Sequence, residues 1–87
     1  MKGKLCRPQA GFGIYVAAST AFPPDPSGRS TFQANWRIFE GVDVRVARMV
    51  EEVTEPYRFL NAEDALDYAE SRARAHLLAQ RAPRRPN

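Results

Sequence analysis

The stretch Asn61-Ala-Glu-Asp-Ala-Leu-Asp-Tyr-Ala-Glu-Ser-Arg-Ala-Arg-Ala-His-Leu77 decides the fold, because it predicts a helix with one apolar side. Asn61 is a favoured N-cap, and Glu63 and Asp64 follow in the first turn, where the helix dipole favours negative charge. Small and aliphatic side chains then recur three or four residues apart, namely Ala62, Leu66, Ala69, Ala73 and Leu77. Since this stripe is mostly alanine, we expect the helix to lie close against a partner surface.

Two upstream stretches alternate with period two, which is typical of half-buried strands. In Gly11–Ser19, one face carries Phe12, Ile14, Val16 and Ala18, and the large side chain of Tyr15 falls on the other face. In Ser30–Glu40, one face carries Phe32, Ala34, Trp36 and Ile38. The proline-rich segment Phe22–Gly28 predicts a hairpin loop between the two strands. Their apolar faces are the expected partner of the alanine stripe.

The stretch Val42–Val53 fits either a strand or a helix, and Glu40-Gly41 predicts a tight turn before it. Its density of β-branched residues favours a strand, and Glu55-Pro56 predicts its end. A short fourth strand at Tyr57–Leu60 is an open alternative. We therefore predict an α+β fold, a three-stranded or four-stranded antiparallel β-meander packed against one C-terminal helix.

The chain of 87 residues has room for one domain, and 44% hydrophobic with 26% charged residues is ordinary globular composition. The net charge of +3 is concentrated near the two ends. We expect residues 1–10 to form a flexible basic arm, residues 11–80 a single α+β domain, and residues 81–87 a disordered basic tail. The longest apolar run, Ile14–Ala18, is far shorter than the roughly 20 residues of a membrane span. With Cys6 as its single cysteine, the chain is expected to be cytoplasmic and without membrane contact.

No set of residues predicts catalysis. Cys6 and His76 are far apart in the sequence, whereas a Cys–His pair must lie within hydrogen-bond reach. The adjacent carboxylates of Glu51-Glu52 and Glu63-Asp64 diverge on a strand or a helix. We expect no enzyme activity, no cofactor and no metal, and no motif identifies a small-molecule substrate.

Binding is the better expectation, through Tyr15, Arg37, Phe39 and Arg45, which are predicted on the sheet face opposite the core. Tyr, Phe and Arg are enriched at protein interfaces, and a small domain gains burial by association, so we expect a homodimer. The alternative is a nucleic-acid-binding protein that stacks bases on Tyr15, contacts phosphate through Arg37 and adds contacts from the basic termini.

The segment Phe59-Leu-Asn-Ala-Glu-Asp-Ala-Leu-Asp-Tyr-Ala69 resembles the passage from the last strand into the helix in small uncharacterised bacterial β-β-β-α proteins. The likeness extends over Gly11 to Leu77. It implies a β-meander with a packed helix and brings no activity or site residues with it.

Overall fold

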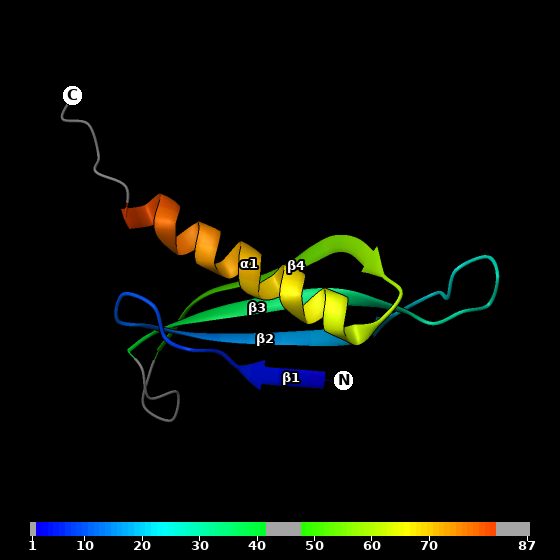
Figure 1. Ribbon diagram of the computed structural model, residues 1–87, viewed down its shortest axis with the longest axis horizontal. Helices are drawn as coiled ribbons and strands as arrows, with labels where there is room; N and C mark the ends of the chain where they lie inside the picture. Colours follow the sequence, from blue (N-terminus) through cyan, green and yellow to red (C-terminus); the bar gives the residue numbers. More distant parts are fainter. Residues whose placement is uncertain (1, 42–47, 82–87) are drawn as a thin grey trace.

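The computed structural model describes residues 2–41 and 48–81, which form a four-stranded antiparallel sheet and one helix (Figure 1). The elements are β1 (Lys2–Leu5), β2 (Phe12–Ala21), β3 (Thr31–Glu40), β4 (Arg48–Phe59) and α1 (Ala62–Arg81). Each strand pairs with its neighbours along the chain, so the sheet order is β1-β2-β3-β4. The predicted loop Phe22–Gly28 lies between β2 and β3. The predicted α+β meander with one C-terminal helix is confirmed.

The helix α1 begins as its sequence predicts. The backbone N–H of Asp64 donates a hydrogen bond of 2.8 Å to Oδ1 of Asn61, which is the N-cap interaction. The helix ends at Arg81, so the first residue of the predicted disordered tail is helical, and residues 82–87 lie outside the described residues. Within the described ranges, no helix has both the length and the apolarity needed to span a bilayer.

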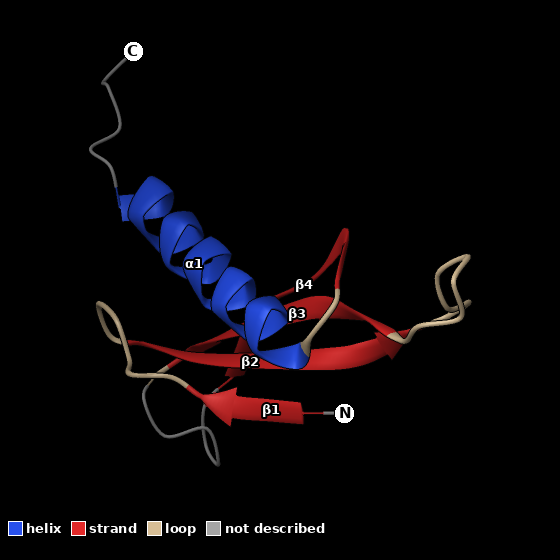
Figure 2. Cartoon of the chain, turned by 45° about the vertical axis from the view of Figure 1, so that its right-hand side comes forward, coloured by secondary structure: helices blue, strands red, loops and turns tan. Residues whose placement is uncertain are grey.

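The core lies between α1 and one face of the sheet (Figure 2). The helix contributes Ala65, Leu66, Ala69, Ala73 and Leu77, and the sheet contributes Ile14, Val16, Ala18, Ala34, Trp36 and Ile38. The helix residues are at most 2% exposed, so four of the five predicted stripe positions are buried, while Ala62 packs at the margin of the core. Trp36 is 4% exposed. The predicted alternation of β2 and β3 therefore assigns the correct faces.

The prediction of a flexible arm over residues 1–10 is wrong for β1, which pairs with β2 from Lys2↔Ala18 to Leu5↔Tyr15. The segment is too short and too polar to show a strand pattern, and its order comes from tertiary contacts. One of these contacts, with the side chain of Tyr15, requires glycine at position 3, because a Cβ on Gly3 would lie 2.0 Å from the hydroxyl oxygen of Tyr15.

The strand interpretation of Val42–Val53 is confirmed for residues 48–53, whereas residues 42–47 lie outside the described residues. The expected end at Glu55-Pro56 is wrong, because β4 continues to Phe59 across an irregularity opposite Gln33–Asn35. An edge strand tolerates proline at such a bulge, since no ladder donor is needed there. The predicted strand at Tyr57–Leu60 is thus the end of β4. Gly41 has the positive φ expected of a turn glycine (102°), but the prediction of a tight turn at Glu40-Gly41 is wrong, because Glu40 pairs with Arg48.

Candidate functional site

The two layers leave one sheet face without cover from any described element, because α1 lies entirely on the other side (Figure 2). We call this the open face. The strand register assigns to it Gly3, Leu5, Gly13, Tyr15, Ala17, Ser19, Ala21, Thr31, Gln33, Asn35, Arg37, Phe39, Met49, Glu52, Thr54 and Arg58. It is the face on which the sequence predicts a binding surface.

One row of large side chains crosses the open face. Tyr15 pairs with Arg37, which pairs with Glu52, so the three residues lie side by side on β2, β3 and β4. The guanidinium carbon of Arg37 lies 5.8 Å from the centre of the Tyr15 ring, within the range of a cation–π contact. Its Nε lies 2.8 Å from Oε2 of Glu52, although it lacks the angle of a hydrogen bond. We call this the raised row.

The next row on the same face, Ala17, Asn35 and Thr54, is lower, and we call it the furrow. It forms the floor of a cavity of about 230 Å³, whose wall includes Ser19, Gln33, Arg37 and Glu52. Ala17 is 1% exposed, so the neighbouring side chains already cover its methyl group.

Asn35 leaves one acceptor unused in the furrow. Its Nδ2 donates to the carbonyl oxygen of Val53 at 3.2 Å and to Oγ1 of Thr54 at 2.9 Å. Because a carbonyl oxygen can only accept, the first contact fixes which side of the amide carries nitrogen. The Oδ1 of Asn35 is buried and has no partner among the described residues. A buried acceptor without a donor is costly, and a donor from outside the chain could reach this atom only if the side chains around it moved.

One end of the open face is apolar. Phe39 is half-buried there, whereas Leu5 is 56% exposed and Met49 is 47% exposed. Leu5 pairs with Tyr15, and Met49 pairs with Phe39, so these side chains adjoin the raised row. Isolated exposed apolar residues are common, but a group beside an uncovered sheet face indicates contact with another surface.

The structure brings three of the four predicted site residues together. Tyr15, Arg37 and Phe39 share the open face, and Arg45 lies outside the described residues. The period-two alternation of Ser30–Glu40 also puts Asn35 on this face, but nothing in the sequence marks its buried acceptor. Leu5 was missed because β1 was taken for an arm.

The lysines of the predicted basic arm do not adjoin the open face. Lys2 and Lys4 pair with positions of β2 that face the helix, and they form ion pairs with Glu63 and Glu70. The acidic first half of α1 therefore holds the basic N-terminal strand against the core layer.

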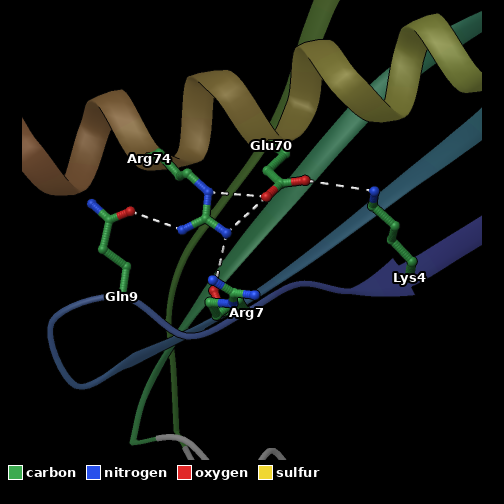
Figure 3. Close-up of polar contacts among 5 residues, drawn as sticks. All are labelled: Lys4, Arg7, Gln9, Glu70 and Arg74. Carbon is green, nitrogen blue, oxygen red and sulfur yellow. Dashed lines mark hydrogen bonds and ion pairs between the residues drawn. The ribbon is translucent and has the colours of Figure 1, made fainter.

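Arg74 is the centre of the polar contacts in Figure 3, and Glu70 joins it to Lys4. Arg74 donates to its carboxylate at 2.7 Å and also to Oε1 of Gln9 at 2.8 Å and the carbonyl oxygen of Arg7 at 3.1 Å. The Arg74 hydrogen bond, followed by the charges of Arg74 and Lys4, lowers the pKa of Glu70. These contacts clamp the chain after β1 onto the helix, which is a structural role.

Cys6 and His76 have separate surroundings. Cys6 is buried, and burial, followed by the nearby charge of Glu70, raises the pKa of its thiol to about 11, so that almost no thiolate exists at neutral pH. The His76 ring lies 5.2 Å from the Trp36 ring, and its Nε2 lies 3.6 Å from Glu51. Within residues 2–41 and 48–81, the polar neighbours of Cys6 and His76 are the carboxylates of Glu70 and Glu51, so the two groups do not form a Cys–His pair with each other.

A second, shallower cavity of about 350 Å³ lies between α1 and Trp36 of β3, and the helix lines it with Arg72, Ala75, His76 and Ala79. Beside it, Glu55 is 6% exposed and accepts a 2.8 Å hydrogen bond from the indole N–H of Trp36. Arg72 lies 3.7 Å from the same carboxylate. Its charged groups have partners within the chain, so this region is a structural clamp rather than a second binding site.

Metal binding has no support from the geometry, since residues 2–41 and 48–81 contain no group of three His, Cys, Asp or Glu side chains arranged to hold an ion. Comparison of the chain with known proteins adds no assignment: no family model, no curated protein and no solved structure matches it.

Proposed function

We propose that this chain is a non-enzymatic interaction protein that associates with a second copy of itself through the open face. The carrying observation is that an apolar end formed by Leu5, Phe39 and Met49 adjoins a sheet face that no described element covers. A two-layer domain of this size gains burial when that face meets another surface.

The face is better suited to association than the edges of the sheet. The β1 edge is only four residues long and carries Lys2 and Lys4, and the β4 edge contains Pro56 and two irregularities of register. Short strands, lysines, prolines and bulges are the devices by which natural sheets avoid edge-to-edge pairing. Pairing of two open faces avoids both edges.

The dimensions of the open face fit a dimer interface. Strands β2 and β3 have 10 residues each in a sheet of four strands. At about 3.3 Å per residue and about 4.8 Å between strands, the open face covers about 600 Å² when it is treated as a flat plane. Its accessible surface area is larger, because side chains project from that plane. A stable interface buries about 800 Å² on each partner.

A second copy fits this face better than nucleic acid does. Phosphate contact requires excess positive charge, yet Arg37 lies against Glu52, and Lys2 and Lys4 lie against acidic residues on the helix side. The remaining cation of this face, among the described residues, is Arg58, which donates to the carbonyl oxygens of Phe22 and Pro23. Paired opposite charges on one face are self-complementary, as an isologous interface requires.

The test is sedimentation velocity over a concentration series with one matched pair of variants. Phe39→Glu places a charge at the apolar end of the open face and should weaken association about 10- to 100-fold. Leu78→Glu makes the same kind of change at a residue of α1 that is 63% exposed, on the other layer, and should leave association unchanged. A wild-type chain that stays monomeric at high micromolar concentration would overturn the proposal.

A mobility-shift series with single-stranded oligonucleotides at two salt concentrations distinguishes self-association from the alternative, nucleic-acid binding. Self-association predicts no shift at low salt. A shift that weakens with salt and is abolished by Tyr15→Ala would favour nucleic-acid binding instead.

A further inference from the structure

The side chain of Tyr15 reaches from β2 across to β1 on the open face. Tyr15 pairs with Leu5, and Gly3 lies two positions away along β1, opposite Ala17. A Cβ on Gly3 would clash with the hydroxyl oxygen of Tyr15 and lie 2.7 Å from its Cζ atom. Since position 3 faces the open side of the sheet, the end of the tyrosine ring occupies the space where a side chain of residue 3 would stand.

Glycine is an unfavourable choice for this strand position on local grounds. It loses more backbone freedom on folding than any other residue, and it offers no side chain to pack. The backbone of Gly3 does not require glycine, because its φ is not in the positive region. Glycine inside a strand often marks the close approach of another group, and here that group is the ring of Tyr15.

The lowered ring belongs to a half of the open face that has little relief. Four of the seven positions that β1 and β2 place on this face are glycine or alanine, namely Gly3, Gly13, Ala17 and Ala21. Tyr15, the largest side chain among the seven, is half-buried. Leu5 stands clear of the sheet, since it is 56% exposed, and it belongs to the apolar end of the face.

We propose that Gly3 is a positioning residue for self-association, an inference that rests on the proposed function. By leaving room for the end of the Tyr15 ring, Gly3 keeps the half of the open face formed by β1 and β2 low. The apolar end beside it can then meet a second sheet. The partner that fits is a sheet of equally low relief, which the open face of a second copy supplies.

The spacing of packed sheets explains why the height of the ring matters. Two sheets stack about 10 Å apart, so a side chain extends about 5 Å before it meets the middle of the interface. A tyrosine that stands upright from its strand is longer than this, whereas a ring that lies on the sheet is only one ring thick. Because Tyr15 pairs directly with Leu5, an upright ring would hold the apolar end away from the second copy.

Gly3→Ala tests the proposal, because the added methyl group displaces the far end of a rotatable side chain. Its next neighbour, the carbonyl oxygen of Val16, lies 3.3 Å away, so the strand keeps its place. The amide chemical shifts of residues 2–5 should show that β1 stays paired. The dissociation constant from sedimentation velocity should rise about tenfold or more. An unchanged dissociation constant would overturn the inference.

A double-mutant cycle with Tyr15→Val identifies the group through which Gly3 acts. Valine is too short to reach residue 3, so in this background Gly3→Ala should change the dissociation constant by less than about twofold. An equal loss in both backgrounds would show that Gly3 acts through the pairing of β1, and this inference would be wrong while self-association stands. Leu78→Ala, at an exposed position of α1, is the control and should change association in neither background.

A spectrum of the monomer gives a measurement that does not require association. At a concentration where the wild type is monomeric, nuclear Overhauser effects should connect the ring protons of Tyr15 to the Hα protons of Gly3, and Gly3→Ala should shift the ring signals. Ring signals that are identical in the two chains contradict the inference. A wild-type chain that stays monomeric at high micromolar concentration overturns the proposed function and this inference together.

Discussion

At the residue scale, two polar side chains define the two sides of the sheet. On the helix side, Glu55 is buried and accepts the indole proton of Trp36, so the core contains a satisfied polar pair. On the open face, Asn35 retains a buried acceptor that no described residue satisfies. Buried polar groups usually have partners, so the first pair stabilises the core, whereas the acceptor of Asn35 is a cost to the fold.

Glu55→Ala should destabilise the chain by about 1–3 kcal/mol, because it leaves the buried indole N–H of Trp36 without an acceptor. Glu55→Gln keeps an acceptor oxygen and should cost less. Urea unfolding followed by tryptophan fluorescence measures both. Glu40→Ala, at an exposed ion pair with Arg48, is the control and should change the free energy of unfolding by no more than about 0.5 kcal/mol. Equal effects of Glu55→Ala and Glu40→Ala would contradict the role given to Glu55.

At the element scale, the sequence predicted those helices and strands whose formation depends on interactions between residues close together in the chain. The N-cap Asn61 and the alanine stripe identified α1, and period-two alternation assigned the faces of β2 and β3, including Tyr15 and Arg37 on the open face. The strand β1 could not be predicted, because Lys-Gly-Lys-Leu carries no periodic signal and is ordered by its pairing with β2 and its ion pairs with α1. The length of β4 was misjudged because Pro56 ends most strands but is tolerated at an edge.

Acid should loosen β1 before the rest of the sheet. Hydrogen bonds and charges from Lys2 lower the pKa of Glu63, and those of Arg74 and Lys4 lower the pKa of Glu70. Carboxylates with lowered pKa values in the folded chain stabilise it above their ordinary pKa of about 4.5, and this contribution is lost as the pH falls through their folded values.

The expected result is that the amide chemical shifts of residues 2–5 move toward random-coil values below about pH 4.5, while the amide chemical shifts of β3 stay at their folded values. Glu63→Gln with Glu70→Gln should show the loosened β1 already at neutral pH and a reduced response to acid. If β1 and β3 change together in the wild type, the ion pairs do not control the docking of β1.

At the scale of the whole molecule, one helix covers one face of a four-stranded sheet, and the described residues supply no second layer for the other. The same small size that limits the core leaves Leu5, Phe39 and Met49 beside the uncovered face. A second copy that packs on the open face would bury this apolar end. Stability and association are then coupled properties of the same surface.

This coupling predicts that the melting temperature depends on protein concentration. When the dimer is the folded species, a hundredfold rise in concentration stabilises it by about 2.7 kcal/mol per dimer, or about 1.4 kcal/mol per chain. For a domain of this size, that amounts to an increase in Tm of about 5–10 °C. Phe39→Glu, whose dimer is weaker, should melt at a lower temperature, and its Tm should begin to rise only at concentrations about 10- to 100-fold higher than for the wild type, whereas Leu78→Glu should keep the wild-type slope. Irreversible aggregation would instead lower Tm as concentration rises, so a reversible increase in Tm identifies association of the folded chain. If the wild-type protein melts reversibly at a Tm that stays constant with concentration, each chain folds without the other and the predicted coupling is wrong.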